Sequence, residues 1–107
     1  MKIEFLYFDG CPNHLQALND LKKTLTEMAI DSDIKIIEIN NNQDAVEKRF
    51  LGSPSIRING KDIEIEENES TEYSMRCRRY RSGSEILGYP PKNLITAILK
   101  KNMGVTQ

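Results

Sequence analysis

The hydrophobic residues at the start of the chain are first continuous and then change their spacing. Residues 3–8 (IEFLYF) form a nearly unbroken run of β-branched and aromatic side chains, which is typical of a buried parallel strand. Residues 13–29 then adopt a helical spacing, with an apolar stripe made of Leu15, Leu18, Leu21, Leu25, Met28 and Ala29. Residues 34–39 (IKIIEI) predict a second strand. A strand, a helix and a strand in such close succession predict a parallel βαβ unit.

The asparagines after the second predicted strand indicate a short helix. Residues 40–42 are all asparagine and can cap a helix over about residues 43–51. The inward face of this helix would carry Val46 and Phe50. Residues 52–54 (GSP) then break the helix, since glycine and proline both disfavour its continuation.

The remaining pattern predicts a β-hairpin and a final helix. Asn59-Gly60 separates two alternating runs, which is the strongest short-range signal for a hairpin turn. Pro90-Pro91 opens a helix that continues to about Lys101. The predicted order of elements is therefore β-α-β-α-β-β-α, a mixed α/β arrangement.

Residues 66–89 do not fit this alternation. The segment is long for an idle connection and contains much apolar surface, so we expect at least part of it to pack. Its apolar residues are Tyr73, Met75, Cys77, Tyr80, Ile86, Leu87 and Tyr89. We expect this segment to fold back as a lid-like loop over the junction between the first strand and helix, bringing Cys77 toward Cys11. Residues 102–107 are predicted to be a flexible tail.

Composition and charge are those of an ordinary globular domain. The 107 residues are 38% hydrophobic and 29% charged, which suits one domain spanning residues 1–107. Lys and Arg number 15 against 16 Asp and Glu, so neither nucleic acid nor a membrane surface is expected as a partner. With no apolar run near the ~20 residues of a membrane span and no signal peptide, the expected location is cytoplasmic. In the reducing cytoplasm, the two cysteines of the chain are expected to be free thiols, redox groups or metal ligands rather than a structural disulfide.

Two motifs in this element order resemble the thioredoxin-like superfamily. The junction FDGCPNH, at residues 8–14, resembles the Cys-Pro-x-Cys redox motif, and GSP, at residues 52–54, resembles the cis-proline loop of that fold. The resemblance covers residues 1–65 and 90–101. It implies a minimal glutaredoxin-like α/β fold, with a mixed four-stranded sheet flanked by helices and a long insertion before the last helix.

A closer similarity is to small uncharacterised thioredoxin-like proteins that share a Cys-Arg-x-Tyr and a Gly-x-Pro region. These regions correspond here to residues 77–80 and 88–90, and part of the chain also resembles a segment of organomercurial lyases. The chain departs from the redox motif at His14, which takes the place of the second cysteine. The first helix therefore cannot close a Cys-x-x-Cys disulfide, so a dithiol mechanism is not expected.

Cys11 and His14 are the first candidates for chemistry. Cys11 would lie at the start of the predicted helix, where unpaired amides and the helix dipole favour a thiolate. The alternative is a small buried hydrophobic residue. His14, three residues later, would share a helix face with Cys11 and, if charged, stabilise its thiolate. A neutral His14 could instead join Cys11 as a metal ligand, or simply be an exposed helix residue.

Cys77 and its neighbours are the second group of candidates. Arg76 and Arg78 flank Cys77 and would favour its thiolate, although an inert thiol is an equal alternative. The arginines can hold a phosphate or carboxylate, or can form an ordinary solvated basic face. In the fold that the chain resembles, a cis peptide between Ser53 and Pro54 turns the backbone of Ser53 toward the reactive cysteine, where it binds an extended partner.

Three functions follow from these residues. The first is thiol–disulfide exchange by a monothiol route, without a cofactor, in which Cys11 attacks a disulfide and Cys77 resolves the intermediate. His14 would assist, and the residues predicted to bind the protein or low-molecular-weight disulfide are Ser53, Pro54, Arg76 and Arg78. The second is binding of a soft metal such as Zn, Cu or Hg through Cys11, His14 and Cys77. The third is a non-enzymatic adaptor whose arginine-rich loop binds an acidic partner.

Overall fold

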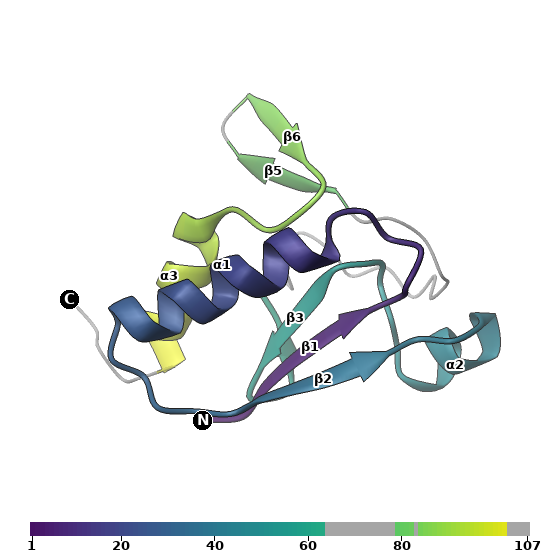
Figure 1. Cartoon of the computed structure of the whole chain (residues 1–107), viewed down its shortest axis with the longest axis horizontal. Coiled ribbons are helices and arrows are strands. Elements are labelled where there is room, and N and C mark those ends of the chain that lie inside the picture. Colours follow the sequence, from purple (N-terminus) through teal and green to yellow (C-terminus); the bar gives the residue numbers. More distant parts are fainter. Residues whose placement is uncertain (64–78, 83, 103–107) are drawn as a thin grey trace.

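The computed structural model describes residues 1–63, 79–82 and 84–102, of which residues 81 and 82 are described by their backbone. The described chain is a mixed α/β structure (Figure 1). Its elements are β1 (Ile3–Tyr7), α1 (His14–Glu27), β2 (Ile34–Glu38), α2 (Asn42–Glu47), β3 (Ser55–Ile58), β4 (Lys61–Asp62), β5 (Tyr80–Ser82), β6 (Glu85–Leu87) and α3 (Lys92–Asn102).

Strand β1 is central to a four-stranded mixed sheet of order β2-β1-β3-β4. It pairs with β2 in parallel and with β3 in antiparallel orientation, so that Phe5 lies between Ile36 and Ile56. The predicted parallel βαβ unit is confirmed. The predicted hairpin is confirmed as well, because Asn59 and Gly60 have φ values of 55° and 84° and connect β3 to β4. A two-residue hairpin turn that matches the right-handed twist of its flanking strands requires positive φ at both central positions.

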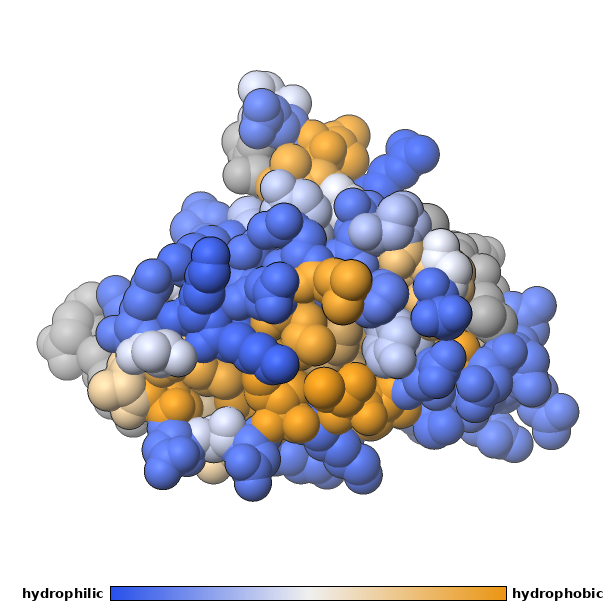
Figure 2. All heavy atoms as spheres, in the orientation of Figure 1, coloured by the Kyte–Doolittle hydropathy of each residue, from blue (hydrophilic) through white to orange (hydrophobic). Residues whose placement is uncertain are grey.

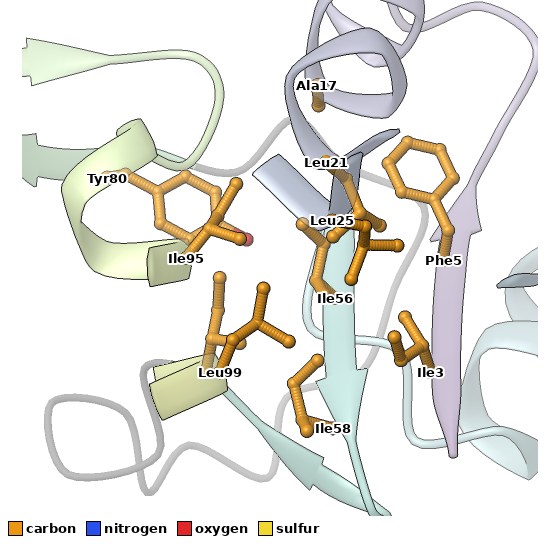
Figure 3. Close-up of a cluster of buried hydrophobic side chains, with 11 residues drawn as sticks. Ile3, Phe5, Ala17, Leu21, Leu25, Ile56, Ile58, Tyr80, Ile95 and Leu99 are labelled. Carbon is orange, nitrogen blue, oxygen red and sulfur yellow. The ribbon is translucent and has the colours of Figure 1, made fainter. Parts of the chain in front are cut away.

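The two faces of the sheet bury separate hydrophobic clusters. Helices α1 and α3 cover one face (Figure 3), where the buried residues are Ile3, Phe5, Ala17, Leu21, Leu25, Ile56, Ile58, Ile63, Tyr80, Ile95 and Leu99. The segment around α2 covers the other face with Leu6, Ile39, Ala45 and Phe50. Alternate residues of β1 thus enter opposite clusters, as the two-residue period of a strand dictates. Because α1 follows β1 after a short turn, the end of β1 and the start of α1 lie at the same end of the sheet.

The apolar stripe of α1 is confirmed at Leu18, Leu21, Leu25 and Met28, which are buried in or packed against the core, but it differs at Leu15 and Ala29. Leu15 is 64% exposed, whereas Ala17 and Leu21 are fully buried. The buried stripe follows Ala17, Leu21, Thr24 and Leu25. Leu15 lies two positions before Ala17, on nearly the opposite side of a helix with 3.6 residues per turn. Ala29 was also predicted in the stripe, but it is exposed beyond the helix end with a φ of 57°. Figure 2 shows that polar surface dominates the outer side of α1, with hydrophobic surface exposed below it.

Helix α2 is shorter than predicted. It ends at Glu47, and Lys48 is its C-cap rather than part of a helix that continues to residue 51. Arg49 then adopts a φ of 54°, which turns the chain out of the helix and carries Phe50 into the core from the following loop. The prediction that Val46 faces inward is wrong, because Val46 is 56% exposed and Ala45 takes the buried position.

The described end of the 66–89 segment forms a second, two-stranded antiparallel sheet, β5-β6. This hairpin, which the sequence pattern did not predict, projects from the body near the start of α1 (Figure 1). We refer to residues 79–82 and 84–89 as the arm. Packing of the arm was expected, and Tyr80 is indeed fully buried, but Ile86 is 61% exposed. The rest of the predicted lid-like loop, residues 66–78 and residue 83, lies outside the described residues. Of the tail predicted at residues 102–107, Asn102 is the last residue of α3, and residues 103–107 lie outside the described residues.

Among the residues that the structure describes, no helix has both the length and the apolar character needed to cross a membrane.

Candidate functional site

Cys11 lies in the turn that joins β1 to α1. Its backbone N–H donates to the carbonyl of Phe8 over 3.0 Å, which folds the chain back directly after the strand. The helix begins only at His14, with Asn13 as its N-cap, so Cys11 lies two residues before the N-cap rather than at the helix start where it was predicted. Pro12 lies in the same turn before the helix.

The sulfur of Cys11 is buried and faces a main-chain carbonyl. The residue is 2% exposed, and its Sγ lies 3.6 Å from the carbonyl oxygen of Ser53. Because a carbonyl oxygen only accepts hydrogen bonds, this contact is an S–H···O hydrogen bond of the protonated thiol. Ser53 is 42 residues further along the chain, so this hydrogen bond joins the β1–α1 turn to the loop before β3.

The loop at Ser53 and Pro54 has the geometry that the sequence motif predicted. The Ser53–Pro54 peptide is cis, and both residues are buried. The Ser53 hydroxyl accepts a 3.4 Å hydrogen bond from the backbone N–H of Phe8, and the Ser55 hydroxyl donates to the carbonyl of Gly52. The structure therefore brings Cys11, Ser53 and Pro54 together, as expected, and fixes the loop against the end of β1.

His14 contacts the backbone of Cys11. Its Nδ1 lies 2.7 Å from the Cys11 carbonyl oxygen, and its ring stacks on Tyr7 with centroids 4.6 Å apart and an interplanar angle of 18°. Since the carbonyl can only accept, Nδ1 carries the hydrogen. In the neutral ring the lone pair is then on Nε2. His14 and Cys11 are neighbours in the site, and the contact between them is through the main-chain carbonyl.

Two residues of the arm reach the same region and were not predicted as site residues. The hydroxyl of Tyr80 donates a 2.6 Å hydrogen bond to the carbonyl of Pro54. Gly88 lies so close to Asn13 that a Cβ at position 88 would overlap the Asn13 amide nitrogen. The only signal in the sequence was the presence of Tyr80 and Gly88 in the shared Cys-Arg-x-Tyr and Gly-x-Pro regions. The two ends of the arm therefore contact the proline loop and the β1–α1 turn, whereas its β5-β6 hairpin projects from the body (Figure 1). The lid-like closure expected of the whole 66–89 segment stays a prediction.

Three of the predicted site residues belong to the 66–89 segment. Arg76, Cys77 and Arg78 lie outside the described residues, so the expected approach of Cys77 to Cys11 stays a prediction. Cys11 is a free cysteine. Within residues 1–63 and the described parts of 79–102, no group of three or more His, Cys, Asp or Glu side chains is arranged to hold a metal ion. The metal alternative therefore depends on Cys77, the third ligand predicted from the sequence, which lies outside the described residues.

Comparison with known proteins gives a family but no relative of established activity. Neither the search of curated proteins nor the search of solved structures found a match. One family model matches residues 11–98, a span that begins at Cys11 and includes the Ser53–Pro54 loop, the arm and most of α3. Since this span covers most of the 107 residues, the chain belongs to the family described as a domain of unknown function, DUF2703.

Proposed function

We propose that the chain is a thioredoxin-like thiol protein that carries out thiol–disulfide exchange by a monothiol route through Cys11. The observation that carries this proposal is the hydrogen bond between the Cys11 sulfur and the carbonyl of Ser53, 3.6 Å apart. It pairs a cysteine in the first βα turn with the proline loop before β3. The mixed four-stranded sheet, with α1 and α3 on one face, is compatible with a thioredoxin-like layout.

The chemistry requires that the thiol loses its proton and leaves the Ser53 carbonyl. The proton passes to solvent, and the thiolate of Cys11 attacks one sulfur of a disulfide R–S–S–R′. A mixed disulfide between Cys11 and R forms as the R–R′ disulfide bond breaks, and R′ leaves as a thiolate. A low-molecular-weight thiol then attacks the R sulfur of the mixed disulfide, which releases Cys11 as a thiolate and forms a disulfide between that thiol and R. In the alternative route, Cys77 attacks the Cys11 sulfur and expels R as a thiolate, and the resulting Cys11–Cys77 disulfide is then reduced by an external thiol. At 2% exposure the sulfur must first become accessible, so a local displacement precedes the attack.

The test uses the full chain with Cys77→Ser, so that Cys11 is the only thiol. We expect incubation with glutathione disulfide to add one glutathione to Cys11, and a dithiol reductant to remove it, both followed by intact-protein mass spectrometry. The matched control, Cys11→Ser with Cys77→Ser, should acquire no adduct. If native protein stays unmodified under conditions in which the urea-unfolded chain reacts fully, Cys11 is an inert buried thiol and the proposal fails.

Soft-metal binding is a second candidate, which the hydrogen bond of His14 favours. Histidine metal ligands commonly donate their other ring N–H to a carbonyl, and His14 donates Nδ1–H to Cys11 in this way. Nε2 of His14 and the sulfur of Cys11 would supply two of the ligands, and Cys77 is the candidate for a third. Zinc titration against a chromophoric chelator tests this function. Tight binding that is lost in both His14→Ala and Cys11→Ser would support it, and unchanged affinity in either variant would contradict it.

A further inference from the structure

Tyr80 is the only residue of the arm whose side chain is fully buried among those that the structure describes. Its ring packs in the core cluster beside Ile95 (Figure 3). Its hydroxyl reaches through the cluster to the Pro54 carbonyl, 26 residues earlier in the chain, over 2.6 Å. A buried hydroxyl that donates to a buried carbonyl fixes both groups, since losing the bond leaves an unsatisfied acceptor in the core.

The hydrogen bond of Tyr80 is adjacent to the contact that holds the Cys11 thiol. The carbonyl that Tyr80 binds belongs to Pro54, and the preceding carbonyl, that of Ser53, accepts from the Cys11 sulfur. The two acceptors are consecutive in the chain. A shift of the Pro54 carbonyl away from Tyr80 therefore moves the Ser53 carbonyl as well.

The arm contacts the other side of the site through Gly88. The backbone of Gly88 lies against the side chain of Asn13, the N-cap of α1. Asn13 is two residues after Cys11. The two ends of the arm thus contact the two loops that enclose the Cys11 sulfur, Tyr80 on the proline loop and Gly88 on the β1–α1 turn.

We propose that Tyr80 is a positioning residue for the thiol site, whose hydroxyl holds the Ser53–Pro54 loop over Cys11 and so sets how often the sulfur becomes accessible. This inference deepens the proposed function, and its consequence for disulfide exchange rests on that function. Local opening of the arm releases the Pro54 carbonyl, frees the Ser53 carbonyl from the sulfur and exposes Cys11 to a disulfide. The remainder of the protein stays folded during this opening.

The test measures the alkylation rate of Cys11 by iodoacetamide at several urea concentrations below the unfolding transition, in a Cys77→Ser background. Local opening gives a rate that hardly depends on urea, whereas reaction through global unfolding rises steeply with urea. Tyr80→Phe keeps the ring in the core and removes only the hydroxyl. We expect it to raise the urea-independent rate about tenfold, the effect of losing one buried hydrogen bond.

The matched control is Tyr89→Phe, which removes a hydroxyl from the half-buried tyrosine at the other end of the arm. We expect this control to leave the urea-independent rate within a factor of about two of the parent. An unchanged rate in Tyr80→Phe would overturn the inference. So would an increase confined to the urea-dependent regime, because the hydroxyl would then contribute only to global stability.

The outcome for Tyr80 can be separated from the outcome for the proposed function. If the alkylation rate responds as expected but glutathione disulfide never modifies Cys11, the positioning role holds and disulfide exchange fails. If exchange occurs at the same rate in Tyr80→Phe and the parent, exchange holds and the positioning role fails.

Discussion

His14 shows how one side chain can be placed correctly by sequence and still contact a different partner. Its position three residues after Cys11 predicted that both lie in one site, and they do. The expected partner was the sulfur, but the ring instead donates to the main-chain carbonyl of Cys11 and stacks on Tyr7. The cause is that Cys11 precedes the helix, so the i,i+3 spacing of a continuous helix does not apply to this pair.

The tautomer of His14 tests directly whether its ring donates a hydrogen bond to the Cys11 carbonyl. We expect the neutral ring to carry its hydrogen on Nδ1, because the Cys11 carbonyl accepts from that atom. The chain contains a single histidine, so a long-range proton–nitrogen correlation spectrum of the neutral ring reports on His14 without ambiguity. A spectrum of the ordinary Nε2–H tautomer would show that the hydrogen bond to Cys11 is absent in solution.

Helix α2 illustrates what a sequence pattern can establish about an element. The asparagine run correctly predicted a capped helix, and the Asn41 side chain accepts from the backbone N–H of Asp44 over 2.7 Å. The end of the helix was not predictable, because Arg49 adopts a positive φ without being glycine. The β5-β6 hairpin was missed for a related reason. Its strands are only three residues long, β5 carries the charged Arg81 at its centre, and the formation of the hairpin depends on burying Tyr80 against distant residues.

Asp44 makes the stability of α2 dependent on pH. Its carboxylate accepts hydrogen bonds from the Lys48 ammonium at 2.6 Å and the Asn40 backbone N–H at 3.0 Å. These hydrogen bonds, that of Lys48 first, hold the pKa of Asp44 below its ordinary value of 3.8. A lowered folded-state pKa means that the carboxylate stabilises the fold above pH 3.8. This stabilisation is lost as the pH falls through the lowered folded-state value.

We therefore expect Asp44→Asn to be less stable than the parent at neutral pH. The two proteins should converge as the pH falls from 3.8 through the lowered folded-state pKa of Asp44, below which the folded parent also loses this charge. Urea unfolding at a series of pH values measures the difference. Glu47→Gln, in the same helix, is the control and should show no comparable convergence. A constant difference between Asp44→Asn and the parent across the whole range would contradict the assignment.

At the scale of the whole molecule, the core depends on elements that are distant in the chain. Leu99 of α3 is fully buried in the same cluster as Ile3 of β1. Truncating a buried leucine removes its transfer free energy and leaves a cavity. We expect Leu99→Ala to lower the free energy of unfolding by about 2–5 kcal/mol. Leu15→Ala should change it by less than about 0.5 kcal/mol, because Leu15 is 64% exposed. Chemical denaturation gives both values, and similar losses for the two variants would refute the assignment of the core.

The central position of β1 has a consequence for how the chain folds during its synthesis. β1 leaves the ribosome before either of its sheet neighbours, and β3 pairs with it only after α1, β2 and α2 have been made. α3, which covers the same face, emerges later still. Nascent chains expose apolar surface until their partners are available. The apolar residues of β1 therefore stay exposed to solvent until the later elements have been synthesised. We expect nascent chains stalled before α3 to bind chaperones, and full-length chains to be released from them.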